Sequence, residues 1–151
     1  MNKESIHQGS CFCGEVTFTV SGEPELMAYC HCESCRSWSA GPVSAFTLWK
    51  PDDFKITGGL DNIAGFDKNP LSEEKNVVSN RVWCKTCGGH LYTDHPAMGL
   101  IDVPTVIISD FSFSPAFHVH YQESVHNMKD GLPKYKDLPS EAGGTGITLT
   151  E

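Results

Sequence analysis

The sequence predicts a mainly β fold, and two observations support this. Short runs of β-branched and aromatic residues recur along the chain, and several alternate apolar with polar residues, as in strands that bury one face. Glycines and prolines separate these runs at short intervals, and no long segment has the period of an amphipathic helix. We therefore expect antiparallel sheets linked by loops, with helix confined to a single turn.

The individual elements follow from local composition. Residues 15–20 alternate apolar and polar side chains with a period of two, which predicts a strand. Residues 33–37, with Ser34 near their start, predict one helical turn. The other predicted strands are residues 43–49, 54–57, 77–83, 105–108 and 118–121. In the last of these strands we interpret His118 and His120 as exposed positions.

The chain is predicted to be one domain followed by a tail. Its 151 residues are enough to bury a core, and no repeat, low-complexity segment or linker divides residues 1–138. Residues 139–151 are rich in glycine and are predicted to form a loose C-terminal tail, in which residues 147–149 can add a short strand.

Charge and hydropathy narrow the class of partner. The formal net charge is −8, and no cluster of Lys and Arg is longer than two residues. This balance argues against nucleic acid or an anionic membrane as the main partner, because both attract basic surfaces. The first residues lack an apolar stretch, and no run approaches the roughly 18–20 residues that span a bilayer. We therefore expect a cytoplasmic chain whose thiols stay reduced.

The cysteines fall into three groups, which are the strongest functional signal in the sequence. In a reducing compartment such groups are typical of metal sites or catalysis rather than of disulfides. The total of seven is odd, which also fits poorly with a complete disulfide set. The groups are Cys11 and Cys13; Cys30, Cys32 and Cys35; and Cys84 and Cys87.

Four of these cysteines are predicted to close a structural zinc site. Such a site takes four ligands in a tetrahedron. The Cys-x-x-Cys turn of Cys84 and Cys87 places two thiolates on one side of a metal, and the glycine after it allows the positive φ with which the backbone folds around a sulfur. The tighter Cys-x-Cys of Cys11 and Cys13 is also followed by glycine. We therefore pair Cys11 and Cys13 with Cys84 and Cys87.

The other three cysteines predict a metal site with an open position. Cys30, Cys32 and Cys35 are close enough in sequence to share one ion. Three protein ligands leave the fourth position for water or substrate, as in catalytic zinc sites. Two other interpretations stay open, namely a redox cluster without metal and a second structural zinc closed by a histidine. The candidate fourth ligands are His7, His31, His90 and His95.

An open site of this kind implies a definite chemistry. Zinc with three thiolates can bind and deprotonate an incoming thiol, which stays nucleophilic and can attack a small carbonyl compound. Arg36 and Lys85 can offset negative charge or hold a substrate carboxylate, and His31 and Glu33 can move protons. The structural alternatives are a surface ion pair for Arg36, a solvent-facing Lys85 and a backbone hydrogen bond for His31.

Four sequence blocks together resemble a known family. The blocks are, in order, Gly9-Ser10-Cys11-x-Cys13-Gly14-x-Val16, Cys30-His31-Cys32-x-x-Cys35-Arg36, Trp83-Cys84-x-x-Cys87-Gly88-x-x-Leu91 and Asp130-Gly131-Leu132-Pro133-Lys134-Tyr135. They extend from about residue 9 to 136. Their order and content resemble the glutathione-dependent formaldehyde-activating enzyme family, also called S-(hydroxymethyl)glutathione synthase, which includes relatives of centromere protein V.

The resemblance implies a fold and two metal sites. The fold is a mainly β domain of the Mss4-like type, with antiparallel sheets stapled by zinc. The implied ligands of a structural zinc are Cys11, Cys13, Cys84 and Cys87. The implied ligands of a catalytic zinc, whose open position takes the thiol of glutathione, are Cys30, Cys32 and Cys35.

The resemblance also implies an activity. It is that of a carbon–sulfur lyase working in reverse, which joins glutathione or a similar small thiol to formaldehyde or another small aldehyde. The candidate catalytic residues are Cys30, Cys32, Cys35, His31 and Arg36. The alternatives are a non-catalytic, zinc-stabilised protein-binding module and a thiol or metal sensor.

Overall fold

The structure is a computed structural model that describes residues 5–67 and 79–151. The chain divides into two compact units. Of the described residues, the first unit comprises 5–25, 47–67 and 79–112, and the second comprises 26–46 and 113–151. Among the described residues, none of the helices has the length and apolarity that a membrane crossing requires.

The first unit contains a three-stranded antiparallel sheet. Its strands, in spatial order, are β1 (Ile6–Ser10), β2 (Thr17–Ser21) and β5 (Phe54–Gly58). In β2 the side chains of Phe18 and Val20 are fully buried while Thr17 and Thr19 are half-buried, so the alternation seen in the sequence places one face of the strand in the core.

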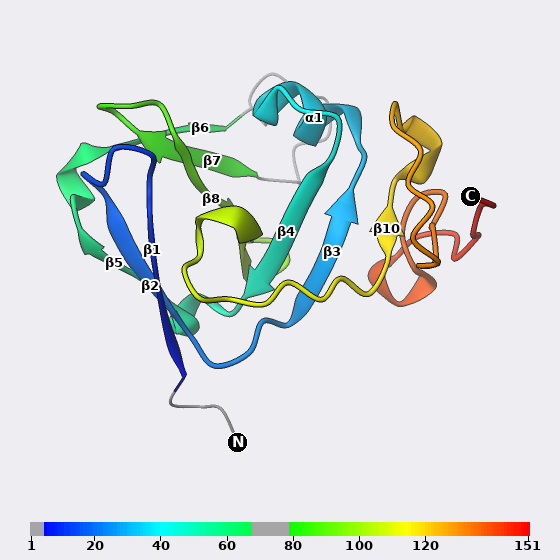
Figure 1. The fold of residues 1–151 in the computed structure, drawn as a ribbon, viewed down its shortest axis with the longest axis horizontal. Coiled ribbons are helices and arrows are strands. Elements are labelled where there is room, and N and C mark those ends of the chain that lie inside the picture. Colours follow the sequence, from blue (N-terminus) through cyan, green and yellow to red (C-terminus); the bar gives the residue numbers. More distant parts are fainter. Residues whose placement is uncertain (1–4, 68–78) are drawn as a thin grey trace. The chain divides into compact units, whose positions relative to one another are not determined.

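An antiparallel meander completes the first unit. Its strands are β6 (Ile63–Asp67), β7 (Asn80–Cys84), β8 (His90–His95) and β9 (Leu100–Pro104), and each pairs with the next (Figure 1). Short 3₁₀ turns also belong to this unit: η1 (Pro51–Asp53) precedes β5, η2 (Leu60–Asn62) connects β5 to β6, and η4 (Thr105–Ile107) follows β9. The tight turn between β7 and β8 carries Cys87, so the hairpin presents its cysteines at one end.

The core of the first unit is apolar and includes two of the cysteines. Phe18, Trp49 and Leu91 are fully buried in it, and Cys11 and Cys84 belong to the same cluster. Burying each large side chain contributes about 1.5–3 kcal/mol. The cysteine-bearing turns are therefore anchored to the core of the unit.

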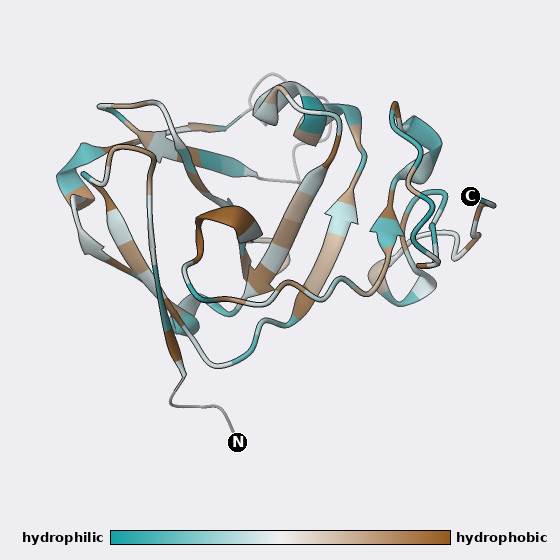
Figure 2. Ribbon diagram, viewed as in Figure 1, coloured by the Kyte–Doolittle hydropathy of each residue, from teal (hydrophilic) through white to brown (hydrophobic). Residues whose placement is uncertain are grey.

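The second unit is built around one strand and one short helix. Strand β3 (Leu26–Cys30) pairs in parallel with β10 (His118–Val119), and helix α1 (Glu33–Ser39) follows β3. Strand β4 (Ser44–Trp49) comes next along the chain and has residues in both units. Apolar colour in Figure 2 falls on β4, whose last four residues are buried.

The C-terminal part of the second unit is mainly loop, with the 3₁₀ turns η5 (Tyr121–Glu123) and η6 (Ser140–Ala142). Residues 133–135 run beside β10, where the amide of His118 donates to the carbonyl of Pro133 and the amide of Tyr135 donates to the carbonyl of His118. The segment 139–151 returns to this edge, where Thr148 pairs with Tyr135. The domain boundary expected at residue 138 remains a prediction, but residues 147–149 do pair with the preceding segment.

The expected mainly β architecture is confirmed, and most predicted elements have a counterpart. The predicted strands at 15–20, 43–49 and 54–57 correspond to β2, β4 and β5, and the predicted helical turn is α1. Residues 77 and 78 of another predicted strand lie outside the described residues, and the rest of it corresponds to β7.

Three local predictions are wrong. Residues 120 and 121 are not part of a strand, because β10 ends at Val119, His120 has a left-handed φ of 53° and η5 begins at Tyr121, and His120 is half-buried rather than exposed. Residues 105–108 are not a strand, because β9 ends at Pro104 and the chain then turns through η4. Proline fixes φ and lacks an amide donor, so the ladder ends there. His118 is not an exposed strand position but is fully buried, because β10 has β3 on one side and residues 133–135 on the other.

Candidate metal centre

The first unit brings four cysteines together from two turns. Cys11 and Cys13 lie in the turn after β1, and Cys84 and Cys87 lie at the end of β7 and in the turn that follows it. Their four sulfurs are all within 4.8 Å of one another. The sequence-based pairing of the two turns therefore matches the arrangement of the side chains.

The spacing of these sulfurs fits a tetrahedral metal ion. With Zn–S bonds of about 2.3 Å, the sulfurs of a tetrahedral site lie about 3.8 Å apart. The Sγ atoms of Cys11 and Cys13 are 3.7 Å apart, and those of Cys13 and Cys84 are 3.8 Å apart. The donor set is four soft sulfur ligands, which favours zinc over hard cations. The residues present thus fit the ion.

Backbone geometry around this cluster explains the glycine after each cysteine pair. Gly88 has a φ of 73°, and its amide donates to the carbonyl of Cys84 at 2.8 Å. The next amide, of Gly89, donates to Sγ of Cys87 at 3.3 Å. On the other turn, the amide of Val16 donates to Sγ of Cys11 at 3.3 Å. The two hydrogen bonds that end on sulfur, from Gly89 and Val16, stabilise thiolate charge there.

The second unit brings the other three cysteines together. Cys30 ends β3, Cys32 caps the N-terminus of α1, and Cys35 lies in the first turn of that helix. Their sulfurs are all within 4.8 Å of one another. The amide of Cys35 donates to Sγ of Cys32 at 3.3 Å, so a thiol takes the capping role usually filled by a serine or aspartate.

The three thiols of this cluster differ in their tendency to ionise. Hydrogen bonds from Cys30 and Cys35 lower the pKa of the Cys32 thiol. The pKa of Cys30 is raised, because its neighbours Cys32 and Cys35 hold charge that opposes a further thiolate and because it is buried. One thiolate therefore forms readily, while ionising the whole group requires a cation to share the charge.

No fourth ligand joins the three sulfurs among the residues that the structure describes. The group contains no histidine, aspartate or glutamate atom within the same distance. His31, although it lies between Cys30 and Cys32 in sequence, has its Nε2 atom 2.8 Å from Nδ1 of His118 instead. The chemistry of the donor set, three soft sulfurs at the start of a helix, fits a zinc ion with one position left for another ligand.

The charged candidate residues near the cysteines are Arg36 and Glu33 in the second unit and Lys85 in the first. Nε of Arg36 donates to the carbonyl of His31 at 2.9 Å. Arg36 and Glu33 also line a pocket of about 510 Å³ beside α1, together with Val125. In the first unit, Lys85 is exposed and donates to the carbonyl of Asp61 at 3.2 Å.

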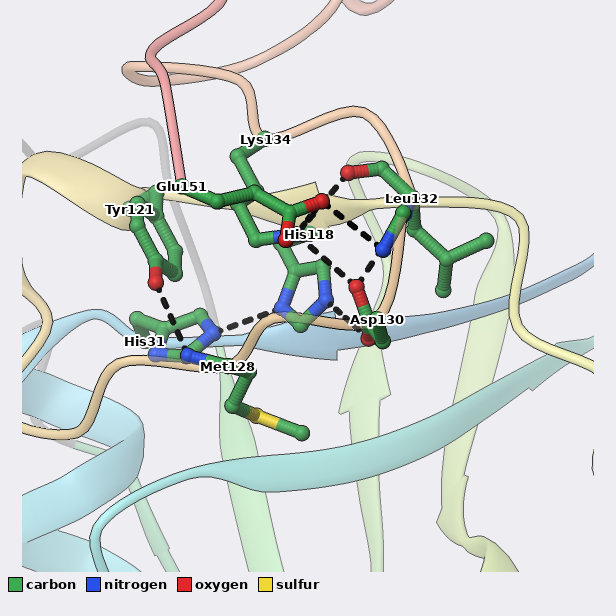
Figure 3. Close-up of polar contacts among 9 residues, drawn as sticks. His31, His118, Tyr121, Met128, Asp130, Leu132, Lys134 and Glu151 are labelled. Carbon is green, nitrogen blue, oxygen red and sulfur yellow. Dashed lines mark hydrogen bonds and ion pairs between the residues drawn. The ribbon is translucent and has the colours of Figure 1, made fainter.

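His31 is the start of a polar chain that the sequence analysis missed and that leads from the buried His31 to the exposed Glu151 (Figure 3). His31 and His118 are both fully buried, and Nε2 of His118 lies 2.7 Å from Oδ2 of Asp130. The other carboxylate oxygen of Asp130 accepts from Nζ of Lys134 at 2.8 Å. Lys134 also pairs with Glu151 at 3.3 Å. Below, this set of five residues is called the polar chain.

Burial and charge set the ionisation of this polar chain. Burial is the main cause that lowers the pKa of His31, and nearby basic side chains such as Arg36 and Lys134 lower it further, to about 4. The ring of His31 is therefore neutral at physiological pH. Burial opposes ionisation of Asp130, but hydrogen bonds from Lys134 and His118 outweigh it and hold the pKa of Asp130 well below its usual range. Asp130 is therefore a carboxylate that can only accept hydrogen bonds.

One sequence signal could have identified the polar chain. Asp130 and Lys134 belong to the closing D-x-L-P-x-aromatic block, whose charged residues had no assigned partner in the sequence analysis. A buried histidine next to a cysteine ligand needs a hydrogen-bond partner. His118 gave no such signal, because a lone histidine in a β-branched run is typical of an exposed strand.

Comparisons with known proteins give the family. The model of the glutathione-dependent formaldehyde-activating enzyme family matches residues 6–123. A putative glutathione-dependent formaldehyde-activating enzyme of Halomonas elongata is 27% identical over 138 residues, which is 88% of this chain and 81% of that protein. An uncharacterized lyase of Schizosaccharomyces pombe is 27% identical over 86 residues. That match covers 57% of this chain and 56% of the yeast protein, little more than half its length.

A solved structure of a Rhodobacter sphaeroides protein is similar with a TM-score of 0.48 and 20% sequence identity, over 70% of this chain and 90% of that one. The family model covers most of the chain and includes all seven cysteines of the two clusters. The mainly β architecture agrees with the Mss4-like fold expected for this family. The chain belongs to the glutathione-dependent formaldehyde-activating enzyme family.

Proposed function

We propose that this chain is a cytoplasmic, zinc-dependent carbon–sulfur lyase that, in the reverse direction, adds a thiol such as glutathione to formaldehyde or another small aldehyde. The observation that carries the proposal is the cluster of Cys30, Cys32 and Cys35, three mutually close sulfurs without a fourth ligand among the described residues. All seven cysteines are free of disulfides, as a reducing cytoplasm requires.

The proposal assigns two zinc ions to each chain, with different roles. Cys11, Cys13, Cys84 and Cys87 hold a structural ion, because four sulfurs complete a tetrahedron and leave no place for substrate. Cys30, Cys32 and Cys35 hold the catalytic ion. When bound there, zinc supplies a Lewis acid that lowers the pKa of an incoming thiol and keeps it as a thiolate.

The proposed reaction balances without an oxidant or a reductant. The sulfur of the thiol forms a bond to the carbonyl carbon of the aldehyde, and the π bond of the carbonyl breaks. The proton that leaves the thiol ends on the former carbonyl oxygen, which becomes a hydroxyl. The chain's part is to bring the thiol and the aldehyde together and to favour the thiolate.

The pocket beside α1 supports a role in binding the thiol. It is lined by Arg36 and Glu33, which present opposite charges on the same helix that carries Cys35. A small peptide thiol carries carboxylate and ammonium groups that such a pair can bind. We propose that Arg36 binds a substrate carboxylate, and that His31 contributes by positioning the cysteines beside it in sequence.

The proposal is tested by measuring the rate of adduct formation between glutathione and formaldehyde with exchange NMR, which follows both directions at equilibrium. The zinc-loaded chain is expected to raise this rate above that of the uncatalysed reaction. Cys35→Ser is expected to abolish the increase, because it removes one of the three sulfur ligands. Ser39→Ala is the matched control, since Ser39 lies on the same helix but does not line the pocket.

The same samples provide a metal count. Two zinc ions per chain, one of them removed by a mild chelator with loss of the rate increase, are the expected result. A chain that binds two zinc ions of equal stability and leaves the rate unchanged contradicts the proposal.

That last outcome would favour a non-catalytic binding module, which one feature of the first unit supports. A pocket of about 350 Å³ in the first unit is lined by Phe12 and Val106. Phe12, which lies between Cys11 and Cys13 in sequence, is 93% exposed, and Val106 is 85% exposed. Neighbouring exposed apolar side chains, such as these two on one pocket, are a feature of interaction surfaces.

The alternative of a thiol or metal sensor rests on the three thiols of Cys30, Cys32 and Cys35. The same three thiols support the enzyme, so they do not distinguish the two functions.

A further inference from the structure

The polar chain is a series of side-chain contacts that joins the segment Cys30-His31-Cys32 to the C-terminal part of the second unit. Two imidazole rings, one carboxylate and one ammonium group follow one another with contacts of 2.8, 2.7 and 2.8 Å (Figure 3). His31 and His118 are fully buried, and Lys134 is 1% exposed. In a network of this kind the donor or acceptor role of each ring nitrogen follows from the role of its neighbour.

The hydrogens of the polar chain can be assigned from its acidic end. The Asp130 carboxylate only accepts, so Nε2 of His118 donates to it. In a neutral His118 ring, Nδ1 is then an acceptor. The neighbouring Nε2 of His31 must therefore donate to it, which leaves Nδ1 of His31 without a hydrogen.

The hydrogen bond between Nε2 of His31 and Nδ1 of His118 determines the orientation of the His31 ring, because Nδ1 of His31 makes no hydrogen bond to a described residue. Among the buried side-chain nitrogen and oxygen atoms of the described residues, this Nδ1 is the one without a hydrogen-bond partner. The bond from Nε2 to His118 is thus the only polar contact of the His31 imidazole with residues 5–67 and 79–151. The ring also packs edge-on against Tyr121, with 4.8 Å between ring centroids.

The backbone of His31 belongs to the frame of the three-cysteine cluster. Its amide donates to the carbonyl of Val119 at 3.1 Å, and its carbonyl accepts from Nε of Arg36 at 2.9 Å. The residues on either side are Cys30 and Cys32. A displacement of His31 therefore moves two of the three sulfurs that hold the metal.

We propose that Asp130 and His118 are positioning residues for the three-cysteine cluster: Asp130 fixes the Nε2–H tautomer of His118, and His118 in turn fixes the Nε2–H tautomer and the orientation of His31. This gives the closing D-x-L-P-x-aromatic block a function at the metal centre. The inference rests on the proposed function only in that the cluster holds a metal ion; it requires no thiol or aldehyde.

Asp130→Asn tests the assignment of the hydrogens, because the surroundings dictate how the amide is oriented. Oδ1 of Asp130 accepts from Nζ of Lys134 at 2.8 Å and from the amide of Leu132 at 3.1 Å, so this position must remain an oxygen. The amide nitrogen of the asparagine then faces His118 and donates to it. His118 is expected to change to the Nδ1–H tautomer, and His31 with it.

Nitrogen NMR of isotope-labelled histidine in the zinc-loaded chain measures the tautomers directly. The unsubstituted chain is expected to show His31 and His118 both as Nε2–H, and Asp130→Asn is expected to show both as Nδ1–H. Asp137→Asn is the matched control, because Asp137 lies in the same C-terminal part but binds the backbone and hydroxyl of Thr145. An imidazolium at His118, an Nδ1–H tautomer of His31 in the unsubstituted chain, or unchanged tautomers in Asp130→Asn overturn the assignment.

The release of metal tests the positioning role. His118→Phe keeps a ring between Tyr29 and Tyr121 but removes both nitrogens. It is expected to speed metal loss from the three-cysteine cluster about 10-fold, the smaller effect seen when outer partners of a metal site are removed. His118→Gln, whose amide can accept from His31 and donate to Asp130, is expected to restore most of the difference.

The four-cysteine cluster is an internal control in this experiment. In the cadmium-loaded chain each cluster gives its own cadmium NMR signal, so chelator-driven loss is followed separately at the two sites. Faster loss at the three-cysteine signal alone supports the role. Equal loss in His118→Phe and the unsubstituted chain, or equally faster loss at both signals, overturns it. A chain that fails to accelerate adduct formation but shows the selective loss refutes the proposed function and leaves this inference standing.

Discussion

Nε2 of His31 lies 2.8 Å from Nδ1 of His118, although the two residues are 87 positions apart in the sequence. One ring belongs to the segment that carries Cys30 and Cys32, and the other belongs to a two-residue strand that holds the C-terminal segment. Through this contact the block that contains Cys30 and the closing block that contains Asp130 become parts of the same polar chain. The first two predictions concern the charged residues of that chain, Asp130 and Lys134.

Stability at low pH is expected to depend on Asp130. Its pKa in the folded chain is depressed by Lys134 and His118, so its contribution is present above about pH 4, the ordinary aspartate value, and is lost as the pH falls toward the folded-state pKa. Asp130→Asn lacks this contribution at every pH. The difference in free energy of unfolding between the two chains, measured by urea titration, should be about 2 kcal/mol near neutrality and should shrink below about pH 4. A difference that stays constant down to about pH 2 contradicts this account.

Replacing the buried ammonium group is expected to destabilise the second unit. Lys134→Met removes the cation shared by Asp130, Glu151 and the carbonyl of Leu132. The change leaves Asp130, whose side chain is 30% exposed, without its cation, so the free energy of unfolding should fall by about 1.5–3 kcal/mol, the usual worth of hydrogen bonds to a charged group. Lys129→Met, at an exposed position of the same segment, is the matched control and should change stability by less than about 0.5 kcal/mol. Similar losses in the two variants would show that the buried pairing is unimportant.

The two cysteine clusters are expected to differ in their effect on stability. Cys87→Ser removes one of four sulfurs that tie two turns to the core of the first unit, and should lower the melting temperature by about 10 °C or more. Cys35→Ser opens a cluster that has no fourth ligand in the part of the chain that the structure describes, and should lower the melting temperature by only a few degrees while abolishing binding of the proposed, easily removed metal. Calorimetry with a metal count on both variants distinguishes the clusters. Equal unfolding of the two variants would argue for two structural sites.

The close packing of β1 on β2 predicts a steric effect at Gly9. Gly9 is the strand partner of Phe18, and a Cβ at this position would run into the Phe18 ring, which is fully buried. Gly9→Ala should therefore lower the free energy of unfolding by about 1–3 kcal/mol, the usual cost of overpacking. Gln8→Ala, at the exposed neighbouring position of β1, is the control for the loss of strand propensity. A well-folded Gly9→Ala chain with unchanged urea midpoint would show that Phe18 can move aside.

Local patterns predicted much of the fold because they report on one face of an element at a time. Alternation over residues 15–20 reflects the burial of Phe18 and Val20 on the core side of β2. The same logic failed at residues 105–108, where an apolar run follows Pro104 and turns through η4 instead of continuing as a strand. Val106 is 85% exposed there, so apolar composition alone did not imply burial.

The grouping of the cysteines into two clusters could be predicted from the sequence. Ligands separated by one or two residues share a metal through local turns, so the spacing itself grouped Cys30 with Cys32 and Cys35. The pairing of Cys11 and Cys13 with the distant Cys84 and Cys87 followed from the need for four ligands, and the sulfur distances of 3.7 and 3.8 Å agree with it.

The sequence by itself determined the mainly β class, the two groups of cysteines that could hold a metal ion and the family, because each depends on composition and spacing over a few residues. Only the tertiary structure decided that His118 is buried and that it connects His31 to Asp130. Burial of a histidine on a two-residue strand depends on what packs against both of its edges. Those neighbours, β3 and residues 133–135, come from distant parts of the chain, and no local pattern around His118 records them.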